Sequence, residues 1–108
     1  MQDIDLYQLF DLDFLLKLKI GIGETSEVTG IPQRQLRYWE DKGIIVSSSG
    51  ERNVRRYDYL NVKKILLIKE LLDEGYTLDR AAEKVSARMT YLNESFRKLQ
   101  HLNTSGDI

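Results

Sequence analysis

The fold of this chain is decided by residues 29–43, which read TGIPQRQLRYWEDKG. Gly30 is a residue type that readily takes the left-handed conformation at the C-terminal end of a helix. Pro32 lies where a new helix would begin, in a first turn where its missing N–H loses no hydrogen bond. Good helix formers follow, and Gly43 ends them. The stretch therefore predicts a tight glycine turn and then a helix over residues 32–42.

A second short helix precedes this turn. Residues 22–29 predict it, with Glu24 in a first turn where a negative charge suits the helix dipole. In the following helix Leu36 and Trp39 are three residues apart and share one face, so both are expected in the core. Two short helices joined by a tight turn make a helix-turn-helix, whose second helix usually enters the major groove of DNA. Because helix pairs are common, this pattern alone leaves the function open.

A β-hairpin is expected after the second helix. Residues 44–46 are apolar and β-branched, residues 47–50 are a turn signal, and residues 53–57 favour a returning strand. The predicted hairpin, residues 45–57, would be a wing that carries basic side chains. Asp58 is a good N-cap for the helix that follows it.

The C-terminal part of the chain is predicted to be helical. Residues 59–73 have the strongest helical spacing of apolar residues, and Gly75 ends this helix. Thr77 is expected to cap a helix over residues 77–87. A last apolar stripe, residues 90–102, predicts one more helix, and the polar residues after it predict a frayed end or linker.

The N-terminal part shows mixed patterns. Residues 4–16 predict one or two short amphipathic helices, and residues 17–20 alternate as a short strand does. Acidic residues alternate with the apolar ones there, but their spacing lacks the glycine and terminal glutamate of a calcium loop. Helix caps are therefore the preferred interpretation of these residues, which are Asp3, Asp5, Asp11 and Asp13.

Composition narrows the class of protein. The chain has 108 residues, 42% of them hydrophobic, and no cysteine, which suits one globular domain without disulfides or thiolate metal sites. No apolar run approaches the roughly 20 residues that span a bilayer, and the N-terminus does not resemble a signal peptide. No nucleophile–base pair, metal loop or phosphate loop is visible. We therefore expect a cytoplasmic protein that is not an enzyme and needs no cofactor or metal.

The charge is distributed unevenly, although the whole chain has a net charge of only −1. Residues 1–30 have a net charge of −4 and residues 71–108 a net charge of −1, but residues 31–70 have nine Lys and Arg against five acidic residues. Such a basic stretch is typical of a nucleic-acid footprint. It also lies within ordinary scatter, so charge alone decides nothing.

The order and spacing of six segments resemble the DNA-binding domain of the MerR family of transcription regulators. The family pattern runs I-G-E-L-A, T-G-V, L-R-Y-Y-E, G-L-L, R-x-Y and G-[FY]-[ST]-L. Its counterparts here are Ile22-Gly23-Glu24, Thr29-Gly30-Ile31, Leu36-Arg37-Tyr38-Trp39-Glu40, Gly43-Ile44-Ile45, Arg55-Arg56-Tyr57 and Gly75-Tyr76-Thr77-Leu78.

The resemblance implies a mainly α fold, a winged helix-turn-helix with a small β-hairpin wing, over residues 19–88. Residues 1–18 have no counterpart in the family pattern, and we expect a helical extension there. Residues 89–103 would be a short helix suited to dimerisation, and the polar residues 104–108 are expected to be a disordered tail or linker. The resemblance also implies a dimer that binds a palindromic operator in double-stranded DNA and distorts the promoter. RNA polymerase or a signalling protein would be a further partner, and no membrane is implied.

The resemblance assigns candidate roles to single residues. Arg37, Tyr38 and Arg55 match positions that contact the DNA backbone, and such contacts supply affinity rather than sequence information. The first turn of the second helix is where base readers lie, although an arginine there can equally contact phosphate. The full set of candidate DNA contacts is Gln33, Arg34, Gln35, Arg37, Tyr38, Arg52, Arg55, Arg56, Tyr57, Tyr76 and Thr77.

Some of these candidates are weaker than others. Alternation along a strand predicts Arg55 and Tyr57 on one face and Arg56 on the other, with Tyr57 partly packed beneath the wing. Arg52 lies at the expected hairpin tip and is a weak candidate. Tyr76 and Thr77 would form a second wing, although Thr77 is more simply a helix cap.

The chain departs from the family pattern at four positions. Thr25 and Ser26 replace the usual leucine and alanine, which predicts that packing shifts to Val28 and to the N-terminal extension. Pro32 replaces a capping serine, and Trp39 replaces the second tyrosine. None of these changes removes a basic side chain.

Two other classes of function remain open. One is a protein-interaction module that reuses this fold without binding DNA, as some chaperone modulators do. The other is an excisionase-like architectural protein that bends DNA. The chain also ends after one short apolar stripe, so it is either a truncated sensor or a minimal regulator whose signal arrives through a partner. Residues 1–18 are expected to pack as a helix on their own domain or across a dimer.

Overall fold

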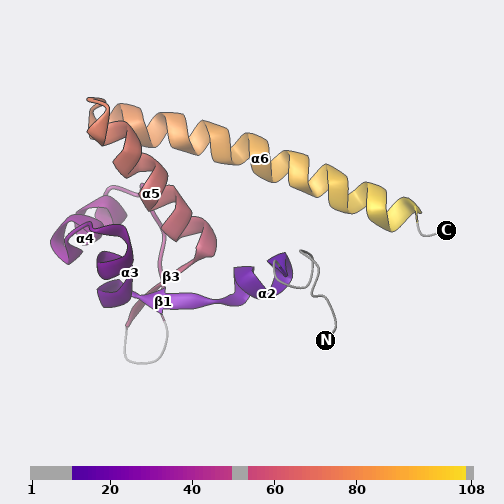
Figure 1. Cartoon of the computed structure of the whole chain (residues 1–108), viewed down its shortest axis with the longest axis horizontal. Helices are drawn as coiled ribbons and strands as arrows, with labels where there is room; N and C mark the ends of the chain where they lie inside the picture. Colours follow the sequence, from indigo (N-terminus) through magenta and orange to yellow (C-terminus); the bar gives the residue numbers. More distant parts are fainter. Residues whose placement is uncertain (1–10, 50–53, 107–108) are drawn as a thin grey trace, which may run out of the picture. The chain divides into compact units, whose positions relative to one another are not determined.

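The computed structural model describes residues 11–49 and 54–106. It divides into two compact units, residues 1–66 and residues 67–108. Along the chain the elements are α2 (Leu12–Lys17), β1 (Lys19–Gly21), α3 (Ile22–Thr29), α4 (Gln33–Asp41), β2 (Ser48–Ser49), β3 (Arg55–Asp58), α5 (Tyr59–Asp73) and α6 (Leu78–Gly106) (Figure 1).

The predicted helix-turn-helix is confirmed as α3 and α4. Gly30 ends α3 in the left-handed conformation, with φ at 76°, and its N–H donates to the carbonyl of Ser26 at 2.8 Å. This conformation is unfavourable for residues with a Cβ, which explains the glycine. Pro32 is the N-cap of α4, one position before the helix, and its carbonyl accepts from the N–H of Gln35 at 2.9 Å. The missing capping hydroxyl therefore leaves α4 capped by backbone alone.

Two threonines form the buried face of α3. The Thr25 side chain is fully buried, and its hydroxyl donates to the carbonyl of Gly21 at 2.7 Å. Thr29 donates to the carbonyl of Thr25 at 2.7 Å and accepts from the N–H of Ile31 at 3.2 Å. Since these hydroxyls find backbone partners, a threonine can replace the expected leucine inside the unit. Val28 remains 64% exposed, so the prediction that packing shifts to this residue is wrong.

The core of the first unit lies between the helix pair and the sheet. Leu36 and Trp39 are both fully buried, as their shared helix face predicts. Burying a large aromatic side chain contributes on the order of 2 kcal/mol or more, so Trp39 is a principal anchor of α4. The buried hydrophobic residues of this unit are Ile31, Leu36, Trp39, Ile44, Ile45, Tyr57 and Ile65.

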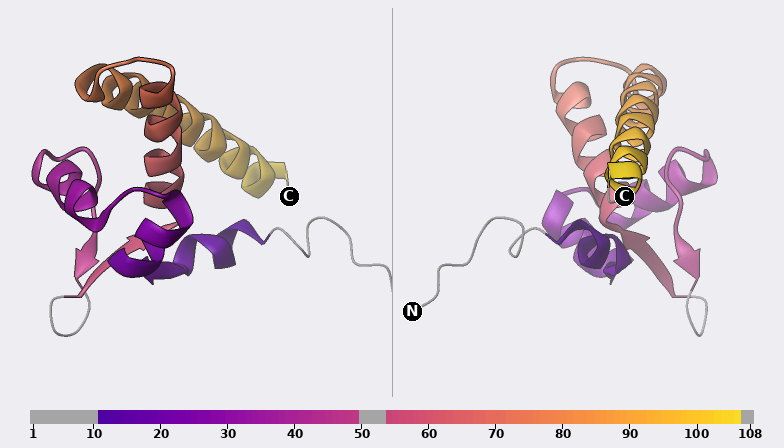
Figure 2. Two further views of the ribbon diagram at one scale, coloured as in Figure 1. Left: turned by 60° about the vertical axis from the view of Figure 1, so that its left-hand side comes forward. Right: turned by 90° about the vertical axis from the view of Figure 1, so that its right-hand side faces the viewer.

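The sheet has three antiparallel strands in the order β1-β3-β2. The hairpin of β2 and β3 confirms the predicted wing (Figure 2). Its first strand is Ser48–Ser49, however, whereas residues 44–46 were predicted as strand and residues 47–50 as turn. Ile44 and Ile45 are buried without joining the sheet, because the chain uses these apolar residues to fill the core directly after α4.

The predicted N-terminal strand forms as β1 and becomes the third strand of the sheet. Ile20 lies opposite Tyr57, and Gly21 lies opposite Arg56. The pairing of β1 with β3 joins segments far apart in the sequence, and nothing in the local spacing indicates it. Lys17 belongs to α2 rather than to this strand.

Helix α2 is short and is capped by an aspartate. The N–H of Phe14 donates to Oδ1 of Asp11 at 3.2 Å. This confirms the predicted helix cap for Asp11. The remaining part of the predicted helical stretch, residues 4–10, lies outside the described residues, together with Asp3 and Asp5.

Asp58 caps α5 as predicted. Its Oδ1 atom accepts from the backbone N–H of Asn61 at 2.9 Å and from the Asn61 side chain, also at 2.9 Å. The Oδ1 atom of Asn61 in turn accepts from the N–H of Val46 at 2.9 Å. The start of α5 is thereby tied to the segment that leads into β2.

The second unit contains one long helix where two were predicted. Thr77 caps α6, accepting from the N–H of Arg80 at 3.3 Å. The helix then runs unbroken to Gly106, so the separation into helices over residues 77–87 and 90–102 is wrong, and residues 103–106 are helical rather than frayed. Residues 86–90 contain neither proline nor glycine, and the Thr90 hydroxyl donates within the helix to the Ser86 carbonyl at 2.9 Å. Nothing there ends the helix.

The apolar side chains of α6 differ in burial along its length. Ala81 and Val85 are buried, as is Ile68 of α5. Tyr91 and Leu92 are 69% and 53% exposed. No helix among residues 11–49 and 54–106 is both long and apolar enough to cross a membrane.

Candidate nucleic-acid interface

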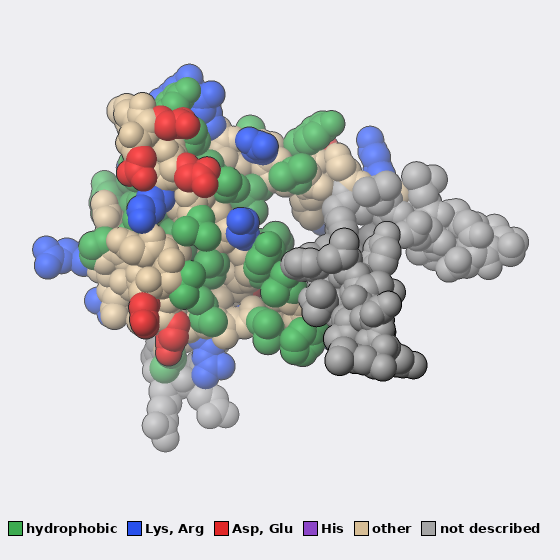
Figure 3. Space-filling model, viewed as in Figure 1, with side chains coloured by type: hydrophobic (Ala, Val, Ile, Leu, Met, Phe, Trp, Pro, Cys, Tyr) green, Lys and Arg blue, Asp and Glu red, His purple; other side chains and the backbone are tan. Residues whose placement is uncertain are grey.

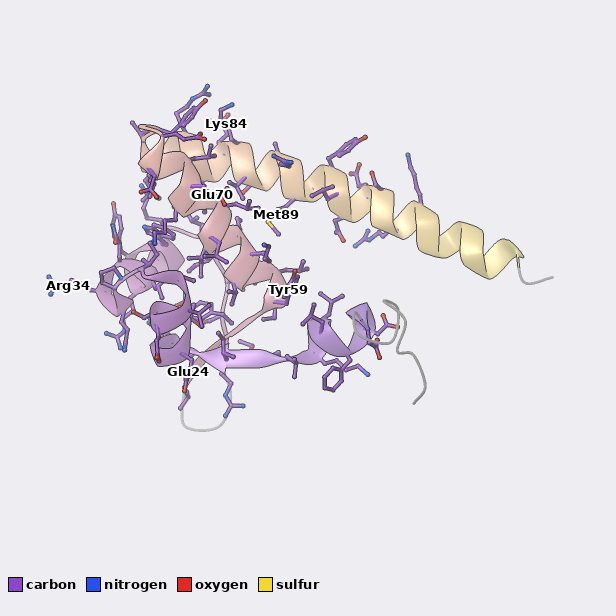
Figure 4. All side chains as sticks on the ribbon, in the orientation of Figure 1. Glu24, Arg34, Tyr59, Glu70, Lys84 and Met89 are labelled. Carbon is purple, nitrogen blue, oxygen red and sulfur yellow. The ribbon has the colours of Figure 1, made fainter. Side chains whose placement is uncertain are left out.

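Helix α4 presents a row of polar side chains to solvent. The buried positions Leu36 and Trp39 fix which face of the helix is turned inward. The exposed face consequently carries all five candidates predicted on this helix, namely Gln33, Arg34, Gln35, Arg37 and Tyr38. Figure 4 shows Arg34 extending away from α4 into solvent. Basic side chains project from the edge of the molecule where α4 lies (Figure 3).

The N-terminal end of α4 surrounds a shallow open hollow. Its lining comes from Pro32, Gln33, Arg34, Gln35 and Tyr38. The Gln33 amide faces α3, since a Cβ added at Gly23 would lie 3.7 Å from its Nε2 atom. Gln33 therefore also packs against the preceding helix, whereas Arg34 extends freely.

A cation–π pair follows along α4. The Lys42 ammonium lies 5.5 Å from the centre of the Tyr38 ring, and Tyr38 is 53% exposed. The two residues are four apart, a spacing that brings side chains together on a helix. Lys42 was not among the predicted contacts, although its spacing of four residues from Tyr38 indicates such a pair. The Lys42 charge therefore lies beside Tyr38, a candidate phosphate contact, in addition to the charge of the neighbouring Arg37.

The returning strand of the wing alternates as predicted. Arg56 is exposed, whereas Arg55 is half-buried and Tyr57 is fully buried on the opposite face. Tyr57 was predicted to be partly packed and was included among the candidate DNA contacts. Full burial makes it a support beneath the wing, out of reach of DNA. Arg52 lies outside the described residues.

The carboxylate of Glu40 joins the helix-turn-helix to the wing. Its Oε1 atom accepts from the Ser47 hydroxyl, and its Oε2 atom accepts from the Tyr57 hydroxyl at 3.2 Å. Arg55 Nη1 lies 3.3 Å from the same Oε2 atom. This last contact is an ion pair without hydrogen-bond geometry, because Nη1 is buried and makes no hydrogen bond to the described part of the chain. No role was predicted for Glu40 or Ser47, because these contacts join positions that no local spacing relates.

The protonation state of Tyr57 follows from its burial and its contact with Glu40. Burial, followed by the negative charge of Glu40 and the hydrogen bond to it, raises the pKa of Tyr57 from 10.0 to about 12. The positive charges of Arg55 and Arg37 act in the opposite direction. Tyr57 is therefore neutral at physiological pH, and its hydroxyl is a donor committed to Glu40.

The candidates of the second wing lie in the unit of residues 67–108. Tyr76 is 37% exposed, and the Lys84 ammonium lies 5.2 Å from the centre of its ring. The Thr77 hydroxyl is used as the cap of α6, as predicted. A contact of Tyr76 or Thr77 with DNA stays a prediction.

Comparison with known proteins identifies the family to which these motifs belong. Residues 21–88, more than half of the chain, match the MerR HTH family regulatory proteins. The chain belongs to the MerR family. It is 30% identical over 97 residues to the HTH-type transcriptional regulator HmrR of Rhizobium leguminosarum bv. viciae, covering 77% of this chain and 75% of that protein.

Other relatives of this MerR-family chain are similar over a shorter part. It is 34% identical over 59 residues to the regulator TnrA of Bacillus subtilis (strain 168), covering 55% of this chain and 54% of TnrA. It is 33% identical over 57 residues to GlnR of Bacillus anthracis, covering 53% of this chain and 44% of GlnR. The chain thus spans about half the length of these two relatives.

A solved structure supports the fold. The chain resembles HiNmlR, a MerR family regulator lacking the sensor domain, in a crystal structure bound to promoter DNA. The TM-score is 0.59, with 18% sequence identity, and the match covers 84% of this chain and 74% of HiNmlR. The winged helix-turn-helix fold predicted from the sequence is confirmed.

Proposed function

We propose that this chain is a sequence-specific transcription regulator that binds double-stranded DNA through α4 and the wing. One observation carries the proposal. The exposed face of α4 holds Arg34, Arg37 and Tyr38, and the neighbouring wing presents Arg55, anchored to the same helix through Glu40. A helix with this exposed face suits the major groove, with the wing on the flanking backbone.

The contacts divide into two kinds. Arg37, Tyr38 and Arg55 bind phosphates, which sets affinity and register but carries no sequence information. Arg34 and Gln35, in the first turn of α4, are placed to read base edges, since arginine pairs with guanine and glutamine with adenine. A phosphate contact from Arg34 is the competing assignment, and the two are separable by mutation.

The proposed regulator acts as a homodimer on a palindromic operator and distorts promoter DNA. Exposed Tyr91 and Leu92 on α6 support dimerisation, because two copies could cover these apolar side chains. In this proposal residues 89–103 contribute the dimer contact, residues 1–18 pack as an extension, and RNA polymerase or a signalling protein is a further partner. The site of action is the cytoplasm, where bacterial DNA lies.

Selection of bound duplexes from a random DNA pool tests this function. The proposal expects a palindromic consensus, with half-sites about one helical turn or a multiple of it apart, because each half-site must present the same face of the DNA to one copy of a two-fold symmetric dimer. Binding without a consensus would favour the architectural, DNA-bending alternative. Absence of binding even at low salt would contradict both and favour the protein-interaction module.

A further inference from the structure

The carboxylate of Glu40 contacts three side chains that are distant in sequence. Ser47 lies seven residues along the chain and Tyr57 seventeen, and both hydroxyls donate to it. Arg55 approaches the same carboxylate at 3.3 Å. One carboxylate thus connects α4 to both the entry and the returning strand of the wing.

The contact with Glu40 buries one guanidinium nitrogen of Arg55 but not the whole side chain. The Nη1 atom is buried against Glu40, yet the Arg55 side chain as a whole is 38% exposed. The exposed fraction therefore lies on other atoms of the side chain. An arginine has five N–H donors in a rigid plane, so an anchored inner nitrogen fixes the direction of the remaining donors.

We propose that Glu40 is a positioning residue for DNA binding: it holds the Arg55 guanidinium at a fixed place relative to α4, with its outer donors directed at a phosphate. This rests on the proposed DNA-binding function. Tyr57 and Ser47 hold the carboxylate itself, because both hydroxyls donate to it and Tyr57 stays protonated at physiological pH. Preorganisation of this kind lowers the entropy lost when the arginine binds.

The direction in which DNA affinity changes when Glu40 is neutralised shows whether this carboxylate acts by positioning Arg55 or only by its charge. A carboxylate near a DNA-binding surface repels phosphate, so its neutralisation should strengthen binding if charge alone matters. If Glu40 positions Arg55, its neutralisation should instead weaken binding. Asp41 provides the matched control, because it is the next residue of α4, has the same charge and is exposed.

The experiment compares Glu40→Gln, Asp41→Asn and Arg55→Ala, each alone, and Glu40→Gln combined with Arg55→Ala, on the selected duplex. We expect Glu40→Gln to weaken binding at least about tenfold, because each copy of the proposed dimer loses a well-placed hydrogen bond to a charged group. Asp41→Asn should leave the affinity unchanged or increase it. In the Arg55→Ala background, Glu40→Gln should have little further effect, because its target is already absent.

Salt dependence distinguishes positioning from partial unfolding. Loss of one phosphate contact from each copy of the proposed dimer lowers the magnitude of the slope of log K against log salt by about 1.8, whereas a smaller folded fraction leaves the slope unchanged. We expect Glu40→Gln and Arg55→Ala to lower the slope alike. Tyr57→Phe, which retains the ring, is a milder second variant and should lower it less.

The outcomes separate this inference from the proposed function. If the wild-type chain binds and Arg55→Ala weakens it, but Glu40→Gln binds as Asp41→Asn does with the wild-type slope, positioning by Glu40 is wrong and DNA binding stands. If Glu40→Gln weakens binding equally with and without Arg55, the positioning of Arg55 is again wrong. If the wild-type chain does not bind DNA, the proposed function itself fails.

Discussion

The hydroxyl of Tyr57 donates a hydrogen bond to Oε2 of Glu40 at 3.2 Å, which ties the central strand of the sheet to helix α4. The bond lies beneath the wing, where the Tyr57 side chain is fully buried. It makes the orientation of the wing depend on the helix proposed to enter the major groove. In the proposed mode of DNA binding, stability and affinity therefore depend on the same contacts.

The first prediction concerns the stability of the fold at high pH. The pKa of Tyr57 is about 12 in the folded chain against 10.0 as the ordinary value. A pKa raised by folding stabilises the protein below the ordinary value and loses this contribution as the pH rises toward the folded value. The wild-type chain should therefore lose roughly 2 kcal/mol more of its free energy of unfolding than Tyr57→Phe between about pH 10 and about pH 12.

Urea unfolding followed by Trp39 fluorescence measures this difference. Tyr57→Phe is the matched control for the wild type, because it keeps the buried ring and removes only the titrating hydroxyl. At neutral pH it should be less stable than the wild type by about 1 kcal/mol, the usual value of one hydrogen bond. Parallel stability curves for the two proteins across the alkaline range would show that Tyr57 does not titrate as described.

The second prediction concerns the buried hydroxyl of Thr29 in α3. Thr29→Val keeps the shape of the side chain but leaves the buried N–H of Ile31 without the hydroxyl that accepts from it. An unsatisfied buried donor costs about 1–3 kcal/mol, so this variant should lose that much free energy of unfolding. Thr29→Ser keeps the hydroxyl and should lose less. A Thr29→Val variant as stable as the wild type in chemical denaturation, or less destabilised than Thr29→Ser, would contradict this role of the hydroxyl and assign the contribution of Thr29 to packing.

The third prediction concerns the turn after α4. Gly43 has φ at +77°, and within the described chain nothing lies within 4 Å of a Cβ added there. Gly43→Ala should therefore destabilise the fold only through the left-handed backbone, by roughly 1–2 kcal/mol. Gly43→Asn should be milder, since asparagine tolerates this conformation better. A loss from Gly43→Ala no larger than that from Gly43→Asn, measured by thermal unfolding, would contradict the backbone explanation.

The fourth prediction separates readers from phosphate contacts on α4. Arg37→Ala should weaken binding to all sequences about equally, because a phosphate contact carries no sequence information. Arg34→Ala should relax the preference at one base position, at a cost of about 1–3 kcal/mol on the preferred base. Binding to a panel of single-base variants of the selected duplex measures both. If both variants weakened binding to every sequence equally, Arg34 would be a phosphate contact and not a base reader.

Local patterns in the sequence predicted most of the elements but few of the contacts between them. The helix pair could be predicted from Gly30, Pro32 and the spacing of Leu36 and Trp39, because helix capping and the buried face of a helix depend on residues close in sequence. Asp58 and Thr77 were recognised as caps for the same reason.

Errors arose where tertiary contacts decide the local structure. Ile44 and Ile45 are residue types that favour a strand, but both side chains are buried in the core directly after α4. The pairing of β1 with β3 and the contacts of Glu40 connect positions far apart in the chain, which no spacing rule detects. The candidate surface on α4 was predictable from motif and helical face, whereas its connection to the wing required the structure.

The salt dependence of DNA affinity tests the central claim most directly. If Arg37 and Arg55 of two copies each neutralise one phosphate, the slope of log K against log salt is about −3.6, and affinity falls about a hundredfold between about 50 and about 200 mM salt. Fluorescence anisotropy on the selected duplex should show a slope at least this steep for the wild-type chain and a slope less steep by about 3.6 for the double variant Arg37→Ala, Arg55→Ala. A wild-type chain that does not bind at low salt, or a double variant that keeps the wild-type slope, would contradict the account.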